Sequence, residues 1–171
     1  MTPPIGPVAL PGARDARELG ERIARLAEPG DVIALAGPLG AGKTVVAAGI
    51  GAGLGVDGPV VSPTFVIARV HGGGRLPLVH VDAYRLGSVG ELDDLDLDES
   101  LDASVTVVEW GEGLADHLAD GFLLVRLTRS DDEDDDVRVA TLTPVGPRWL
   151  ARAGALAALA VAVAPHPVAG S

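Results

Sequence analysis

The stretch GPLGAGKT at residues 37–44 constrains the fold of this chain more than any other part of its sequence. It matches the pattern G-x-x-x-x-G-K-[ST], in which glycines let the backbone curl until successive N–H groups point at phosphate oxygens. The apolar run at residues 32–36 predicts a buried strand before this loop, and a helix is predicted from Lys43 to about Leu54 after it. Strand, glycine loop and helix in this order predict an α/β domain that binds nucleotide phosphates.

Lys43 is the only lysine among the 13 basic residues of the chain. Its ammonium is a compact charge on a long stem that reaches the β- and γ-phosphates of a nucleotide, whereas the guanidinium of arginine is flat and bulkier. Thr44, the next residue, offers a hydroxyl to Mg²⁺. We therefore interpret the lone lysine as one that arginine could not replace.

Two acidic residues follow apolar strands and are candidates for the metal side of the site. Asp82 comes after a predicted strand at residues 78–81, and Glu109 comes after one at residues 105–108. Open α/β sheets build their sites at the carboxyl ends of strands. Enzymes with this glycine loop need an acid there to hold Mg²⁺, directly or through water. The residue pattern alone leaves open which of the two acids does so.

Four other positions each have two interpretations. Residues 62–64 (SPT) either sense the γ-phosphate or form a proline turn. Trp110 either packs in the core or lies at the nucleotide, and Arg85 either makes a structural ion pair or contacts a phosphate. His80 is interpreted as a structural partner rather than a metal ligand.

The rest of the chain alternates between predicted helices and strands, which indicates a mainly parallel α/β sheet. Further strands are predicted at residues 8–10, 60–61, 65–70, 122–128 and 137–143, and further helices at residues 15–27, 91–101, 114–118 and 149–164. No repeat or linker divides the chain. Residues 1–150 are therefore expected to form one domain, and residues 151–171 an Ala-rich C-terminal helix or tail that packs on it or trails from it.

Composition excludes several classes of function. The formal net charge is −11, which argues against a broad nucleic-acid surface because such surfaces need Lys and Arg to neutralise phosphates. The absence of cysteine excludes disulfides, thiolate catalysis and Cys-ligated metals. No secretory signal is visible, and the longest uncharged apolar run, residues 153–164, is too short for a bilayer span. A cytoplasmic protein without a membrane partner is expected.

Four motifs together resemble one family: GPLGAGKT at 37–44, SPTF at 62–65, HVDAYRL at 80–86 and EW at 109–110. In this order and spacing they are similar to those of the TsaE family, also called YjeE. The glycine loop alone would name no family, whereas the combination is highly specific. The resemblance covers about residues 8–150.

The resemblance implies an α/β, P-loop NTPase-type three-layer fold with a mainly parallel sheet plus antiparallel strands. It also implies that the protein binds ATP and Mg²⁺ and hydrolyses ATP, slowly alone and in dependence on partners. Those partners would be TsaD and TsaB, which transfer a threonylcarbamoyl group to the adenosine beside the anticodon of tRNA. The ATPase would reset or drive that complex, and tRNA would be met only through it.

The resemblance also implies roles for individual residues. Thr44 and Glu109 would ligate Mg²⁺, while Asp82 would orient or activate the attacking water, or hold a water of the metal. Thr64 would face the γ-phosphate, and Tyr84 with Arg85 would support the site or the partner surface. The implied nucleotide-binding residues belong to the loop, the start of its helix and one aromatic position: Leu39, Gly40, Ala41, Gly42, Lys43, Thr44, Val45 and Trp110.

The sequence departs from the family pattern in two places. Pro38 stands where the family usually has an acid, and the acidic run at residues 131–136, expected near the adenine side, has no basic residue for a base or ribose contact. Two alternative functions also remain. One is a nucleotide-dependent switch with negligible turnover. The other is a small-molecule kinase, for which the late arginine cluster would have to form a lid: Arg126, Arg129 and Arg138.

Overall fold

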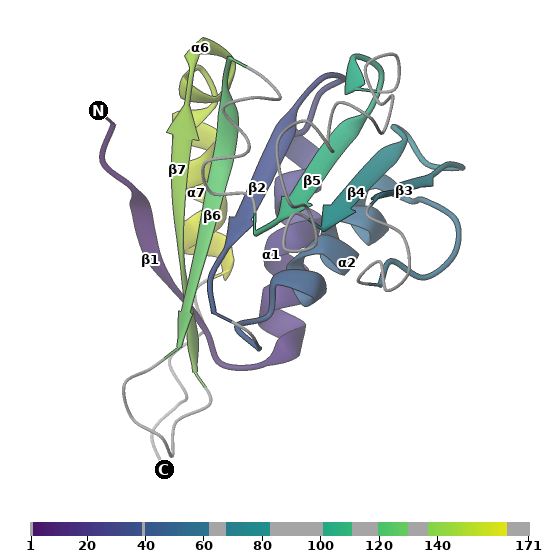
Figure 1. Ribbon diagram of the computed structural model, residues 1–171. Coiled ribbons are helices and arrows are strands. Elements are labelled where there is room, and N and C mark those ends of the chain that lie inside the picture. The colour runs from purple at the N-terminus through teal and green to yellow at the C-terminus, as the bar shows by residue number, and fades with distance from the viewer. Residues whose placement is uncertain are drawn as a thin grey trace.

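The computed structural model describes residues 2–38, 40–61, 68–82, 101–110, 120–129 and 137–163. These residues form one seven-stranded sheet in the order β1-β7-β6-β2-β5-β4-β3 (Figure 1). The strands are β1 (Ile5–Leu10), β2 (Val32–Ala36), β3 (Ala68–His71), β4 (Leu78–Asp82), β5 (Val105–Glu109), β6 (Phe122–Arg129) and β7 (Arg138–Val145). The helices are α1 (Ala13–Leu26), α2 (Lys43–Leu54), α6 (Pro147–Leu150) and α7 (Ala153–Val163).

The centre of the sheet is parallel and its flanks carry the antiparallel strands. Strands β6, β2, β5 and β4 run parallel, whereas β7 is antiparallel to β6 and to β1, and β3 is antiparallel to β4. Every residue of β2, β4 and β5 is buried, which explains why these strands read as continuous apolar runs rather than alternating ones. The predicted α/β fold with a parallel centre and antiparallel strands is confirmed.

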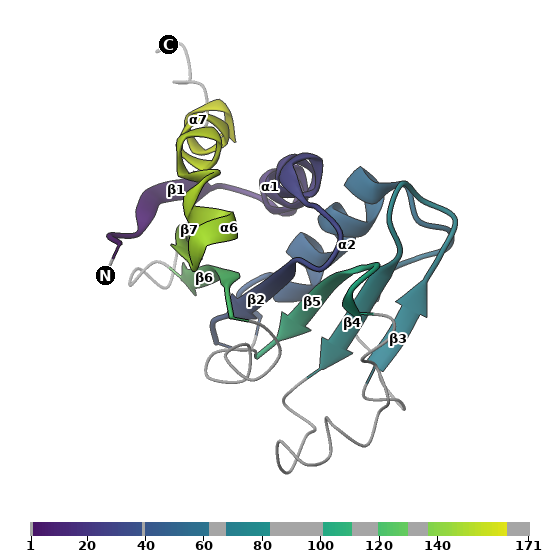
Figure 2. The same ribbon diagram turned by 90° about the horizontal axis from the view of Figure 1, so that it is seen from above.

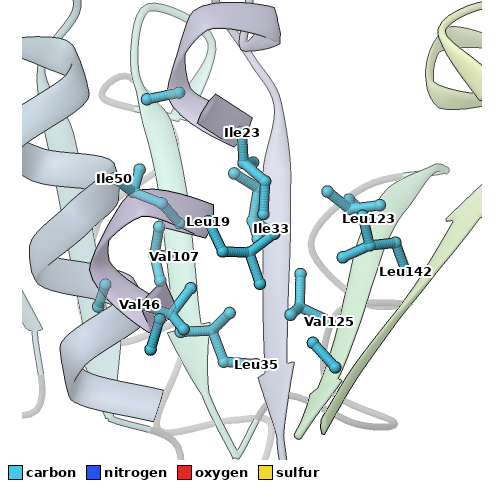
Figure 3. Packing of buried hydrophobic residues seen from close by; sticks show 14 of the residues in the cluster. Leu19, Ile23, Ile33, Leu35, Val46, Ile50, Val107, Leu123, Val125 and Leu142 are labelled. Carbon is cyan, nitrogen blue, oxygen red and sulfur yellow. The ribbon is translucent and has the colours of Figure 1, made fainter. Parts of the chain in front are cut away.

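Helices α1, α2 and α7 cover one face of the sheet (Figure 2). Their apolar side chains meet those of β2, β5 and β6 in the core shown in Figure 3: Leu19, Ile23, Val46, Ile50, Ile33, Leu35, Val107, Leu123 and Val125. Helices α1 and α2 cross so closely that a Cβ at Gly20 would overlap the backbone carbonyl of Val46. The described residues contain no helix layer on the opposite face, and most of the residues of the helices predicted at 91–101 and 114–118 lie outside them.

The C-terminal segment is helical, but not as one helix. The prediction of a single helix over residues 149–164 is wrong in this respect, because the chain turns at residues 151–152 between α6 and α7. The turn lets Trp149 sit in the core, only 1% exposed, while Arg152 points at the start of β2. The predicted strand at 60–61 is also absent, although Val60 is buried.

Arg152 ties this segment to the domain through a two-bond ion pair with Asp31. The guanidinium donates to the two carboxylate oxygens at 2.6 and 2.9 Å and to the carbonyl of Leu26 at 2.7 Å. It also lies 3.9 Å from the ring centroid of Trp149. The hydrogen bonds to Asp31 raise the pKa of Arg152 above its ordinary value, against the opposing effect of burial.

Arg152→Ala is expected to lower the free energy of unfolding by about 3 kcal/mol, because it leaves the Asp31 carboxylate buried without its partner. That carboxylate is 1% exposed. Arg148→Ala is the matched control, since the Arg148 side chain is 51% exposed beside the same carboxylate and its loss should cost at most about 1 kcal/mol. Urea unfolding of both variants measures the difference in their free energies of unfolding. Equal unfolding midpoints would show that the buried Asp31 carboxylate does not depend on Arg152.

Several predicted features lie outside the described residues. They are the segments 62–67, 91–100 and 114–118, the acidic run at 131–136, Tyr84 and Arg85. None of the helices in the described part of the chain combines the length and the apolar character needed to cross a bilayer.

Candidate active site

The glycine loop joins the end of β2 to the start of α2. Gly40 and Gly42 have φ angles of 77° and 101°, which side chains rarely adopt, so the loop can only close as it does with glycine there. The Ala41 N–H donates to the carbonyl of Pro38 at 3.1 Å within the turn. Helix α2 begins at Lys43, so its free N–H groups and the positive end of its dipole lie at the loop.

The side chain of Lys43 reaches back into this loop. Its Nζ donates to the carbonyls of Gly37 and Pro38 at 2.7 and 2.8 Å and lies 3.7 Å from the ring centroid of Trp110. The residue is 5% exposed, and burial lowers the pKa of the ammonium, while the charges of Glu109 and Asp82 oppose that change. Pro38 therefore contributes a carbonyl to the lysine at the position where the family usually has an acid.

Thr44 and Glu109 are joined across the site, although 65 residues separate them in sequence. The Thr44 hydroxyl donates to Oε1 of Glu109 at 2.7 Å. The other oxygen, Oε2, lies 2.5 Å from Nε2 of His80. Glu109 and His80 are 3% and 0% exposed, so the interaction between them is shielded from water.

The two candidate acids stand side by side. Asp82 and Glu109 are register partners at the carboxyl ends of the parallel strands β4 and β5, and Asp82 is 6% exposed. Glu109 lines the same cavity as Lys43, and the charges of Glu109 and Asp82 raise the pKa of the ammonium against the effect of its burial. The predicted strands before these two acids are confirmed, and the choice between the acids as metal ligand stays a prediction.

The residues present fit a magnesium ion held together with a nucleotide. A hydroxyl and a carboxylate 2.7 Å apart border a cavity of about 320 Å³ lined by the loop, Val45 and Trp110. Mg²⁺ is usually bound by one or two carboxylates together with substrate phosphates rather than by a cage of protein ligands.

Trp110 belongs to this site rather than to the core. Its φ is 63°, which is unusual for a residue other than glycine. Its backbone N–H donates to the carbonyl of Leu35 at 2.9 Å. The backbone thus turns sharply after Glu109 and brings the indole ring beside the Lys43 ammonium. The structure therefore places the Trp110 ring at the glycine loop, and its contact with a nucleotide stays a prediction.

A second cavity, of about 360 Å³, lies on the other side of the loop and was missed by sequence reasoning. Its walls come from the β1–α1 turn, the loop and β7: Pro11, Gly12, Ala13, Ala16, Gly40, Ala41, Gly42, Val45 and Arg138. Arg138 donates to the carbonyl of Gly40 at 3.2 Å. The only signal in the sequence was the Pro-Gly turn before α1, and nothing in it indicated that this turn borders a loop some 30 residues later.

The late arginines lie on strands beside the loop. Arg126 lines a cavity with Gly37, Pro38 and Trp110, and Arg129 and Arg138 are register partners near Gly40. The cluster is therefore part of the β6–β7 pair in the described structure. Leu39 and Thr64, two of the predicted site residues, lie outside the described residues.

Comparisons with known proteins place this chain in a family. A sequence model described as Threonylcarbamoyl adenosine biosynthesis protein TsaE matches residues 10–138. A protein of Streptomyces coelicolor named tRNA threonylcarbamoyladenosine biosynthesis protein TsaE is 56% identical over 137 residues, which are 78% of this chain and 93% of that protein. A Bacillus subtilis protein of the same name is 38% identical over 136 residues, or 79% of this chain and 83% of that protein.

A solved structure has the same fold. The crystal structure of Bacillus subtilis YdiB superposes with a TM-score of 0.72 at 33% sequence identity, covering 88% of this chain and 93% of that one.

Proposed function

This chain belongs to the TsaE family, and we therefore propose that it is a Mg²⁺-dependent ATPase that supports threonylcarbamoyladenosine formation in tRNA. The observation that carries the proposal is the meeting of Lys43, Thr44 and Glu109 at one glycine loop. A loop that binds phosphate, a hydroxyl and a buried carboxylate are the parts that nucleotide hydrolysis needs.

Phosphate binding falls to the loop and to the start of α2. The backbone N–H groups of residues 39–44 and the Lys43 ammonium would hold the β- and γ-phosphates, with the ammonium leaving its two carbonyl partners for phosphate oxygens. Thr44 and Glu109 would hold Mg²⁺, which when bound neutralises the charge that develops on the transferred phosphoryl group.

Asp82 would position the attacking water. It lies beside Glu109 at the end of β4 and is almost fully buried, so its carboxylate is held within a water-poor site. We propose that it accepts a hydrogen bond from that water, or from a water of the metal. Thr64 is proposed as the residue that faces the γ-phosphate.

The nucleoside end of ATP would occupy the 360 Å³ cavity beside Gly12. This cavity shares Gly40, Gly42 and Val45 with the cavity at Glu109 but lies on the side of β2 that faces β6 and β7. A nucleotide lying along the loop would thus have its terminal phosphates beside Glu109 and its base beside Arg138. Stacking on the guanidinium plane is a common way of holding a base.

Ala13→Phe is expected to weaken ADP binding about tenfold, because the ring would fill the space of the base and remove about 1–2 kcal/mol of contact. Ala13 is exposed at the first turn of α1, so the fold should tolerate the change. Pyrophosphate binding should be unchanged. Ala158→Phe, at an exposed position on α7, is the control, and competition against a fluorescent ADP analogue measures both ligands. Equal loss for ADP and pyrophosphate would argue against this placement.

The proposed partners are TsaD and TsaB, with tRNA met only through their complex. A net charge of −11 suits docking on proteins better than gripping tRNA directly. Work on tRNA would place the protein in the cytoplasm. We take residues 1–150 as the ATPase domain and residues 151–171 as an extension, of which α7 packs against α1 and β1.

Repeated tRNA modification by TsaD and TsaB, with the threonylcarbamoyl donor supplied, tests this role. Threonylcarbamoyladenosine in tRNA should exceed one equivalent per complex only when ATP and the present protein are added. Lys43→Ala protein should give no such increase. Full turnover without the protein, or with the variant, would exclude the proposed role.

A further inference from the structure

We propose that His80 is a positioning residue that fixes the carboxylate of Glu109 for the metal. Nε2 of His80 lies 2.5 Å from Oε2 of Glu109, and the histidine is fully buried. The motif that contains His80 also contains Asp82, for which a separate role is proposed. His80 itself has none so far beyond that of a structural partner.

A carboxylate that binds a metal is ionised and only accepts hydrogen bonds, so in the proposed role Nε2 of His80 is the donor. The other ring nitrogen, Nδ1, is buried and has no hydrogen-bond partner among the described residues. In the described structure, the one hydrogen bond of the His80 side chain is with Glu109.

Each of the two carboxylate oxygens of Glu109 thereby has its own partner. Oε2 is held by His80 from the neighbouring strand, and Oε1 is left to face Thr44 at 2.7 Å. His80 pairs with Val107 and Asp82 pairs with Glu109, so the histidine lies one pleat behind the site on the same face of the sheet. Strands β4 and β5 lie side by side (Figure 1) and are buried throughout, so the donor is rigidly placed.

Without this donor, the carboxylate would lose its fixed orientation. Glu109 is 3% exposed, so water cannot easily replace the missing hydrogen bond. Partners that orient metal ligands commonly contribute about 10- to 100-fold in metal affinity. We therefore expect His80→Ala to raise the Mg²⁺ concentration needed to strengthen ADP binding by about 10- to 100-fold. This inference rests on the proposed role of Glu109 as a metal ligand.

The experiment measures ADP binding to the full chain with a fluorescent ADP analogue, first in EDTA and then across a Mg²⁺ titration. His80→Ala removes the donor, and His80→Gln restores an N–H at a similar reach. His71→Ala is the matched control, because His71 is also buried, at 7% exposure, on the adjacent strand β3, where it is the register partner of Leu78 rather than of a site residue. Thermal melts confirm that each variant is folded.

The expected result is a raised half-saturating Mg²⁺ concentration in His80→Ala, recovery in His80→Gln, and wild-type behaviour in His71→Ala. Affinity in EDTA should stay within about twofold of wild type, since the phosphate loop is untouched. An unchanged Mg²⁺ requirement in folded His80→Ala, or an equal loss in EDTA, would overturn the inference. If the wild type itself shows no Mg²⁺ effect, the proposed function fails first, so the two failures are distinguishable.

Discussion

Replacing Lys43 by arginine should weaken nucleotide binding by about 100-fold even though the positive charge is retained, equivalent to about 3 kcal/mol. The ammonium fits between the carbonyls of Gly37 and Pro38, at 2.7 and 2.8 Å, with the Trp110 ring 3.7 Å away. A planar guanidinium is broader than this space and cannot present a compact charge to two phosphates. Because Lys43 is only 5% exposed, the loop has little room to adapt to a larger side chain.

The reverse exchange nearby is the control. Arg129→Lys changes an exposed arginine close to Gly40 and should leave ADP affinity within about threefold, because an exposed contact contributes little. Calorimetric titration with Mg-ADP compares the two variants. Wild-type affinity in Lys43→Arg would show that the lone lysine of the chain is not required by the site.

Glu109→Gln should lower ATP hydrolysis by about 100-fold or more, while the protein still binds nucleotide. The change keeps the shape of the side chain but removes the charge that faces Thr44 and the metal. Binding in EDTA should be almost unchanged, since the loop and Lys43 are intact. Phosphate release under saturating Mg-ATP measures the loss of hydrolysis. ADP titration in EDTA measures the retained binding.

Glu18→Gln is the matched control, because Glu18 is a half-exposed glutamate of α1 that pairs with Arg22 at 2.9 Å and lines neither cavity at the loop. It should hydrolyse ATP at the wild-type rate. Equal rates in wild type and Glu109→Gln would remove Glu109 from the mechanism and shift attention to Asp82.

The sequence predicted the parts of the site that follow from local pattern. The glycine loop, the strand before it and the helix from Lys43 are where the pattern put them. The placement of Asp82 and Glu109 followed from strand ends, because parallel strands bring their carboxyl ends to one edge. These predictions needed only the periods of strands and helices and the demands of glycine.

What sequence reasoning missed depends on register and on contacts between distant segments. The bond from His80 to Glu109 requires β4 and β5 to pair with His80 opposite Val107, which no local pattern reveals. The cavity between Gly12 and Arg138 is built from segments at opposite ends of the chain. At the break between α6 and α7, Arg152 makes an ion pair with Asp31, a contact between distant segments that the apolar helical pattern does not reveal.

Release of phosphate from Mg-ATP by the pure protein, without any small-molecule acceptor, tests the central claim most directly. If the protein is an ATPase of this kind, it should release phosphate slowly alone and faster after TsaB and TsaD are added. Lys43→Ala should release none under either condition. Tight ATP binding with no phosphate release, with or without the partners, would contradict this claim and would favour a nucleotide-dependent switch or a kinase at the same loop.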